Sequence, residues 1–194
     1  MRIIAGKFKG RALTPPQGQD TRPTSDRLRE ALFNVLAHGY DDPITGARVL
    51  DLFAGTGALG LEALSRGAAF VQFVEEAASA RGLIKSNVEA LGVAGITKVY
   101  RRDATYMGPV APAEPFSLVF CDPPYGKGLA KRALASALKG GWLTPDALVI
   151  VEERTDQQDI LPEGFQMIEE RAYGLTKLVF AGLDGPKGTT EGPN

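Results

Sequence analysis

Four short apolar runs separated by helical segments restrict the possible folds of this chain more than any other feature. The runs VLDLF, FVQFV, LVFC and LVIV begin at residues 49, 70, 118 and 148. Strands that are apolar on both faces are typical of a parallel sheet whose crossover helices cover both sides. The sequence therefore predicts an α/β fold of the Rossmann-like type, with a mostly parallel sheet.

Seven strands are expected, the last two joined through Gly174 as a hairpin, so the final strand should be antiparallel. Their ranges are 48–53, 70–75, 98–101, 116–121, 148–152, 165–173 and 175–181. Helices are expected at 58–66, 77–91 and 129–138. An earlier amphipathic helix is expected from an N-cap at Thr24 or Ser25 to a stop at Gly39, with apolar residues at helical spacing.

The chain has 194 residues, fewer than the roughly 250 at which single cores tend to divide. We expect a basic β-hairpin extension over 1–20, one main domain over 21–183 and a disordered tail over 184–194.

The composition narrows the chemistry and the location. No apolar stretch approaches the roughly 20 residues of a membrane span, and the first residues lack the apolar core of a signal peptide, so we expect a cytoplasmic protein. The single cysteine, Cys121, allows no internal disulfide, and with one histidine, His38, we expect metal-free chemistry.

Positive charge is concentrated at the beginning of the chain. Residues 1–30 contain seven basic and three acidic side chains, whereas the whole chain has a net charge of −1. Such asymmetry indicates either a basic arm that meets a polyanion or a solvated surface ribbon.

Gly55, Gly57 and Gly60 lie between an expected strand and an expected helix and match the pattern GxGxxG, a weak signal by itself. Three acids strengthen it, because Asp51, Glu75 and Asp103 lie at or near the carboxyl ends of strands, where α/β sheets bind ligands. Glu75 follows at the distance typical of an acid that accepts hydrogen bonds from ribose hydroxyls. Asp103 would lie beside an adenine, so the acids together indicate an adenosine pocket.

Both a nicotinamide dinucleotide and S-adenosylmethionine (SAM) contain adenosine. A dinucleotide needs its pyrophosphate held at the helix N-terminus, whereas SAM carries no phosphate and has an ammonium group that Asp51 could help to neutralise. Asp51 therefore favours SAM.

The expected strand 116–121 is followed by Asp122, Pro123, Pro124 and Tyr125. An exocyclic amine on a nucleobase is a poor nucleophile, because its lone pair is delocalised into the ring. The Asp122 carboxylate and the Pro123 carbonyl could accept its two N–H groups and stabilise the positive charge that develops during attack. Tyr125 could stack on the base and orient it.

These motifs resemble the class I SAM-dependent methyltransferases that act on exocyclic base amines. The segments RIIAGKFKGR (2–11), RPTSDRLREALFN (22–34) and DLFAGTGALGLEALSRGA (51–68) further resemble the RsmD family, bacterial guanine-N2 methyltransferases of small-subunit (16S) ribosomal RNA. The resemblance covers residues 1 to about 183. It implies 16S rRNA, within the small subunit or its assembly intermediate, as partner, and the guanine at position 966 of that RNA as target.

The resemblance also assigns residues. The catalytic set is Asp122, Pro123, Pro124 and Tyr125. The SAM-binding set is Thr24, Asp51, Phe53, Ala54, Gly55, Gly57, Glu75, Glu76, Asp103 and Ala104. The RNA-binding set is Arg2, Lys7, Lys9, Arg11, Arg22 and Arg27. The family usually carries an aspartate where this chain has Ala77, and Glu76 is the candidate to compensate for it.

Three other functions remain open at this point. An adenine-N6 methyltransferase uses the same Asp-Pro-Pro-Tyr arrangement. A ribosome-assembly factor without catalytic activity could retain the fold, and a dinucleotide-dependent oxidoreductase could use the glycine motif.

Overall fold

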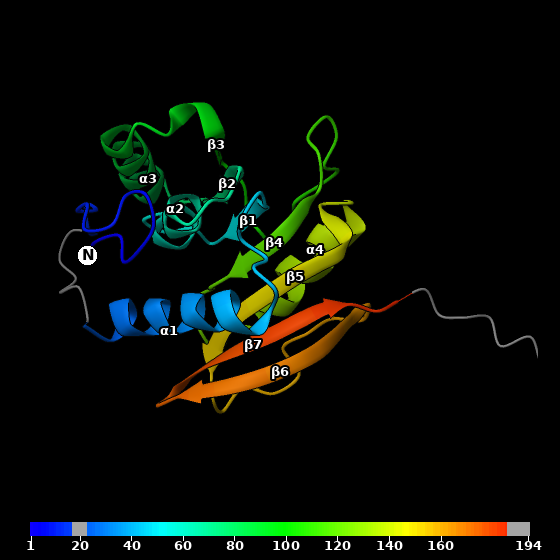
Figure 1. Ribbon diagram of the computed structural model, residues 1–194. Helices are drawn as coiled ribbons and strands as arrows, with labels where there is room; N and C mark the ends of the chain where they lie inside the picture. Colours follow the sequence, from blue (N-terminus) through cyan, green and yellow to red (C-terminus); the bar gives the residue numbers. More distant parts are fainter. Residues whose placement is uncertain (17–22, 186–194) are drawn as a thin grey trace, which may run out of the picture.

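The computed structural model describes residues 1–16 and 23–185, and side chains from residue 26 onward in the second range. It contains a seven-stranded sheet with the order β3-β2-β1-β4-β5-β7-β6 (Figure 1). The strands are β1 (Arg48–Leu52), β2 (Phe70–Val74), β3 (Thr97–Tyr100), β4 (Phe116–Cys121), β5 (Leu143–Arg154), β6 (Phe165–Tyr173) and β7 (Thr176–Leu183). The helices are α1 (Pro23–Gly39), α2 (Ala58–Ser65), α3 (Ala78–Leu91) and α4 (Leu129–Lys139), with a 3₁₀ turn η1 (Ala94–Ile96).

The predicted fold class is confirmed. Strands β3, β2, β1, β4 and β5 pair in parallel, and β7 is antiparallel to both of its neighbours, β5 and β6. The strand order reverses between β1 and β4, and open α/β sheets bind ligands beyond the carboxyl ends of the strands at such a switch point. The fold therefore points to the ends of β1 and β4 as the place for a site.

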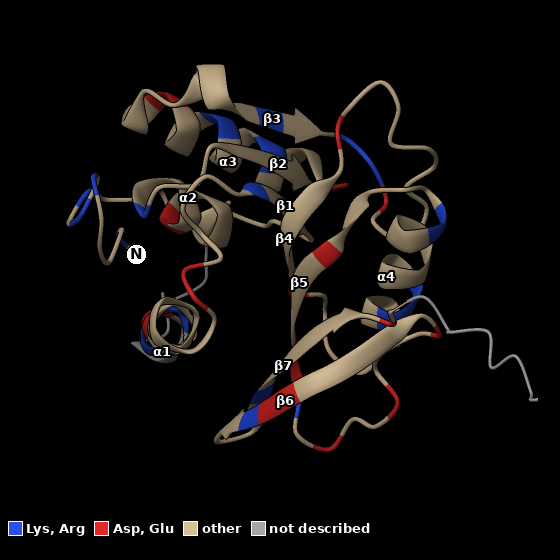
Figure 2. Ribbon diagram, turned by 45° about the vertical axis from the view of Figure 1, so that its right-hand side comes forward, with Lys and Arg blue, Asp and Glu red and all other residues tan. Residues whose placement is uncertain are grey.

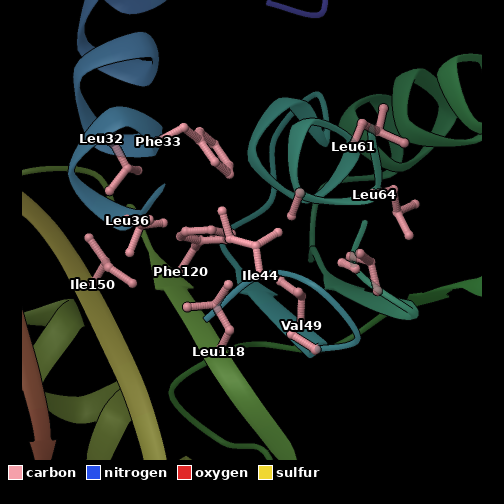
Figure 3. Packing of buried hydrophobic residues seen from close by; sticks show 14 of the residues in the cluster. Leu32, Phe33, Leu36, Ile44, Val49, Leu61, Leu64, Leu118, Phe120 and Ile150 are labelled. Carbon is pink, nitrogen blue, oxygen red and sulfur yellow. The ribbon is translucent and has the colours of Figure 1, made fainter. Parts of the chain in front are cut away.

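Helices cover both faces of the sheet. Helices α1, α2 and α3 lie on one face, and α4 lies on the other (Figure 2). On the first face, Phe33 of α1 packs against Phe120 of β4 with ring centroids 5.6 Å apart. Figure 3 shows how Leu32 and Leu36 of α1 point toward β4 and β5 in the same cluster. This two-sided cover explains why β4 reads as a continuous apolar run.

The predicted N-terminal hairpin forms only in part. Arg2 and Ala12 make one antiparallel bridge, and the residues between them form turns rather than two strands. The two arms are joined by backbone bonds from the N–H of Ile3 to the carbonyl of Arg11 at 3.0 Å and from the N–H of Gly10 to the carbonyl of Ile3 at 2.9 Å. The segment also bonds to α2, where Glu62 accepts the N–H groups of Ile4 at 2.8 Å and Ala5 at 3.0 Å. The segment is thus a short, irregular hairpin that is also held by α2.

Two predicted boundaries are wrong. Helix α1 begins at Pro23, so Thr24 and Ser25 occupy positions in its first turn rather than the N-cap position; proline is favoured in the first turn, where its missing N–H has no partner to lose. Strand β5 begins at Leu143 rather than at 148: Leu143 pairs with Phe116 and Leu148 with Leu118, so the residues of β5 around Pro145 bulge out between these two pairs.

The remaining boundaries agree with prediction to within one or two residues. The predicted tail, apart from the exposed Asp184 and Gly185, lies outside the described residues. Across residues 1–16 and 23–185, no helix combines the length and the apolar character that crossing a membrane requires.

Candidate active site

The glycine-rich loop joins β1 to α2 in a constrained conformation. Phe53, the first residue after β1, has a φ of 60°, in the left-handed region that costs a non-glycine residue about 1–2 kcal/mol. Gly57 at the N-cap of α2 has a φ of 79°, and a Cβ there would lie 3.2 Å from the ring of Phe73. Backbone strain of this kind is concentrated at functional sites, which agrees with the place of this loop at the switch point.

Asp51 is buried beneath this loop. Its side chain is 1% exposed, and its Oδ2 accepts the backbone N–H of Gly60 at 3.0 Å. Burial raises the pKa of Asp51 to about 8; the bond from Gly60 acts in the opposite direction, and the charge of Glu75 adds to the rise. Asp51 thus links β1 to α2. It lies beneath the glycine-rich loop, so it can position the loop.

Glu75 follows β2 and connects two backbone segments. One carboxylate oxygen accepts the N–H of Gly55 at 2.9 Å, and the other accepts the N–H of Ala77 at 2.8 Å. Ala77 is the N-cap of α3 and has no side chain that could cap the helix. Each carboxylate oxygen has capacity for a further hydrogen bond, so Glu75 can hold the loop and still accept from a ligand.

A cavity of about 500 Å³ opens beyond the carboxyl ends of β1 to β4. Its walls contain apolar side chains from several elements, among them Val74, Ala104 and Leu129, and two basic ones, Arg102 and Arg132. Five residues of the predicted SAM-binding set line it: Phe53, Glu75, Glu76, Asp103 and Ala104.

The other members of that set are placed differently. Asp51, Ala54 and Gly57 are buried, and Gly55 reaches the cavity only through its bond to Glu75. Thr24 belongs to α1, but its side chain lies outside the described part of the chain.

The cavity has the chemistry that an adenosine group requires. Oδ1 of Asp103 accepts the N–H and the hydroxyl of Thr105, at 2.8 and 2.7 Å, which fixes the carboxylate at the cavity rim. Ala104 beside it is 3% exposed and presents an apolar wall. Acids at two neighbouring strand ends with an apolar surface between them fit the hydroxyls of a ribose and the face and amine of an adenine.

The Asp-Pro-Pro-Tyr segment follows β4 beside this cavity. Pro124 is exposed and forms part of the cavity wall, whereas Pro123 is buried. Asp122 does not line the cavity; its backbone N–H reaches toward the carbonyl of Leu52, at 3.5 Å. The Asp-Pro-Pro-Tyr segment therefore has the cavity on one side and a second group of acids on the other, which come from β1 and β5.

Four carboxylates gather at this place. Burial raises the pKa of Asp122 well above its usual range, and repulsion from Glu152, Asp51 and Glu153 adds to the rise. Burial also raises the pKa of Glu152, against the effect of its bond with Tyr125. Over residues 1–16 and 23–185, no group of acids, histidines and cysteines is arranged to hold a metal ion.

Tyr125 is 40% exposed, and its hydroxyl donates a hydrogen bond to Oε1 of Glu152. Burial and this bond raise the pKa of Tyr125 above its ordinary value, so the phenol remains protonated and continues to donate. The ring is thus anchored at its hydroxyl end while part of its surface faces solvent, as a stacking platform requires.

The predicted RNA-binding residues lie apart from the acids. Arg2, Lys7, Lys9 and Arg11 are exposed on the N-terminal segment, which Figure 2 shows beside α2, and Arg27 is exposed on α1. The guanidinium of Arg11 donates to the carbonyl of Ala90 at the end of α3. Arg22 lies outside the described residues.

Three residues at the site are absent from the sequence predictions. Glu152 ends the predicted strand 148–152, so the reasoning that selected Glu75 and Asp103 at strand ends would have selected it too. Arg102 precedes Asp103, and Arg132 is in the first turn of α4, but only the structure shows that both line the cavity.

The strand order, the antiparallel β7 and the glycine-rich loop at the switch point define a class I methyltransferase fold. A solved structure described as a putative methyltransferase, yhhF from Escherichia coli, superimposes with a TM-score of 0.79 and 34% identity, covering 96% of this chain and 99% of that one.

The family described as Conserved hypothetical protein 95 matches residues 1–182. The putative rRNA methyltransferase YlbH of Bacillus subtilis is 38% identical, over 91% of this chain and 95% of that protein. Ribosomal RNA small subunit methyltransferase D of Escherichia coli K12 is 37% identical, over 90% of this chain and 85% of that protein. The chain belongs to this family, and the resemblance of its motifs to RsmD proteins is confirmed.

Proposed function

We propose that this protein transfers a methyl group from SAM to the exocyclic N2 of a guanine in small-subunit ribosomal RNA. The observation that carries the proposal is the position of the Asp122–Tyr125 segment. Pro124 forms part of the wall of an acid-rimmed cavity, and the adjacent Asp122 supplies a partly buried carboxylate whose pKa is raised. The names of the relatives, which are ribosomal RNA methyltransferases, support the same reaction.

The cofactor half of the site is the cavity at the ends of β1 to β4. Glu75 would accept the ribose hydroxyls, and Asp103 would accept the adenine amine, with Ala104 and Leu129 against the ring. SAM supplies a methyl group on a sulfonium, so the donor is already activated. The chain then has to position the accepting nitrogen.

The amine half of the site is the end of β4. The Asp122 carboxylate and the Pro123 carbonyl accept the two N–H groups of the guanine amine, and Tyr125 stacks on the base. As the N–CH₃ bond forms and the S–CH₃ bond breaks, the nitrogen becomes positively charged and releases one proton. Asp122 takes that proton, a role that its raised pKa suits.

The exposed basic residues of the N-terminal segment would hold RNA phosphates. Such contacts orient a nucleic acid without reading its sequence. The target base must leave any stack to reach Asp122, so a loop nucleotide or a flipped one is the substrate.

The test is methyl transfer from SAM labelled in its methyl group to unmethylated small ribosomal subunits and to naked 16S rRNA, with the product nucleoside identified by mass. We expect N2-methylguanosine at a single position. N6-methyladenosine as the product would replace this proposal with the adenine alternative, and SAM binding without any transfer would favour an assembly factor.

The matched variant is Asp122→Asn, which keeps the size of the side chain and removes its charge. We expect turnover to fall by at least about 100-fold, since such losses follow removal of one preorganised electrostatic group. The affinity for SAM should stay within about threefold, because Asp122 does not line the cavity.

A further inference from the structure

Glu152 stands beside Asp122 in the sheet. Cys121 of β4 and Val151 of β5 are partners in register, so the residues that follow them lie at the same level, Asp122 just beyond the end of β4 and Glu152 within β5. Phe120 and Ile150, two residues earlier, both belong to the cluster covered by α1. Side chains alternate along a strand, so Asp122 and Glu152 point to that same face.

The carboxylate of Glu152 is held in place there. Its Oε1 accepts the hydroxyl of Tyr125, which leaves Oε2 with no hydrogen bond from the described residues. Glu152 is partly buried, and its Oε2 is not among the buried polar atoms without a partner, so this oxygen remains accessible and can accept a hydrogen bond from a ligand. Glu152 is therefore a hydrogen-bond acceptor beside Tyr125, next to the position proposed for the base.

The Watson–Crick edge of guanine presents two neighbouring donors, the exocyclic N2 amine and the ring N1–H. Adenine presents its amine beside a ring N1 that carries a lone pair and no proton. A carboxylate next to the one that holds the amine would thus attract guanine and repel adenine. A site built to bond a donor also rejects analogues that lack it, because its own buried group is left unpaired.

We propose that Glu152 is a specificity-determining residue that accepts the N1–H of the target guanine while Asp122 and Pro123 accept the N2 amine. This inference rests on the proposed function. It adds to that function the reason why an Asp-Pro-Pro-Tyr site selects guanine over a base whose ring N1 has no proton.

The test compares two bases at the methylated position of reconstituted small subunits: guanine and 2-aminopurine. The second base retains the N2 amine but has a lone pair at N1. With the unmodified protein, we expect kcat/KM for guanine to exceed that for 2-aminopurine by about 10- to 100-fold, the range for a hydrogen bond to a charged group.

The variant Glu152→Gln can turn an amide N–H toward the lone pair of 2-aminopurine. We expect it to lower the guanine-to-2-aminopurine ratio to within about threefold of one, because an amide serves a donor or an acceptor equally. The matched control is Glu153→Gln, which removes the same charge from the next residue. Glu153 is 2% exposed and accepts the N–H groups of Gly126 and Arg154, so the ratio should stay at the level of the unmodified protein.

The outcomes separate this inference from the proposed function. Failure of the unmodified protein to methylate guanine at N2 would remove the proposed function itself. A Glu152→Gln variant that loses activity on both bases by the same factor would show that Glu152 acts only through Tyr125, and the specificity role would be wrong. An unchanged ratio with unchanged activity would overturn it as well.

Discussion

Glu75 and Gly55 are joined by a hydrogen bond of 2.9 Å from the loop backbone to the carboxylate that follows β2. The acid assigned to the ribose thus also fixes the glycine-rich loop, and its second oxygen caps α3 through Ala77. Cofactor affinity and the order of the loop should therefore depend on the same side chain.

Replacement of Glu75 tests this dependence. Glu75→Ala removes both backbone bonds and the proposed ribose acceptor, so we expect the affinity for SAM, measured by calorimetry, to fall by at least about 100-fold, with hydrogen bonds to a charged group stabilising by about 1.5–3 kcal/mol each. Glu75→Gln keeps one acceptor oxygen and should lose less. The control is Glu89→Gln, an exposed acid on α3, and an Ala variant that binds SAM as that control does would contradict the assignment.

The pH dependence of turnover should reflect Asp122. The carboxylate must be ionised to accept an N–H, and burial together with Glu152, Asp51 and Glu153 raises its pKa. Ionisation is then lost as the pH falls through the raised pKa, so turnover under saturating SAM should decline at a higher pH than an ordinary aspartate would cause. Removing one neighbouring charge with Glu152→Gln should move this decline in turnover to lower pH. If the pH at which turnover declines stays the same in this variant, Asp122 is not the group responsible for the decline.

Asp51 should make the protein less stable as the pH rises. Its pKa is raised from 3.8 to about 8 in the folded state, so the folded state binds the proton more tightly than the unfolded state. Its contribution is complete below pH 3.8 and is lost as the pH rises through 8, with a slope of at most about 1.4 kcal/mol per pH unit. Asp51→Asn retains an acceptor for Gly60. Urea unfolding at several pH values should show a smaller loss of stability in this variant between pH 4 and 8, and identical slopes would argue against the shift.

Much of this fold follows from local patterns. β1, β2 and β4 are predictable because both of their faces are buried, which leaves a run of apolar residues in the sequence. Glu75 and Asp103 are predictable as site residues because parallel strands place their carboxyl ends at one edge.

What escapes prediction depends on contacts between distant residues. The N-terminal segment bonds to Glu62 and Ser65, which are nearly sixty positions away, so its local pattern indicates a hairpin that forms only one bridge. The early start of β5 depends on the pairing of Leu143 with Phe116 of β4, across a bulge in β5. The bond between Tyr125 and Glu152 is likewise invisible in a pattern that ends at the motif itself.

Ala77 offers a test of helix capping next to the cavity. It is the exposed N-cap of α3 and provides no side-chain bond. Ala77→Asp should cap the helix and stabilise the protein by about 1 kcal/mol, which corresponds to about 2–4 °C in Tm for a domain of this size. The control is Ala90→Asp at the opposite end of α3, where a negative charge opposes the helix dipole and should lower Tm. Equal shifts for the two variants would contradict capping.

Glu62 holds the N-terminal segment against α2. It is fully buried, pairs with Arg66 at 2.8 Å and with Arg29 at 3.9 Å, and accepts the N–H groups of Ile4 and Ala5. This carboxylate in the core is therefore one of the groups, together with Ser65, that hold the basic residues proposed to contact RNA in place.

Glu62→Gln should release this segment. The amide has one acceptor oxygen and no charge, so the buried Arg29, the partly buried Arg66 and a backbone N–H lose their partner. Breaking a buried pair costs about 3–5 kcal/mol. We expect unfolding at lower urea, faster hydrogen exchange at the amides of Ile4 and Ala5, and weaker RNA binding whose decline with salt is less steep, because fewer phosphates are contacted. Glu30→Gln, an exposed acid on α1, should leave all three measurements unchanged. Protected amides at Ile4 and Ala5 in the Glu62 variant would show that other contacts, such as those of Ser65, are sufficient to fix the segment.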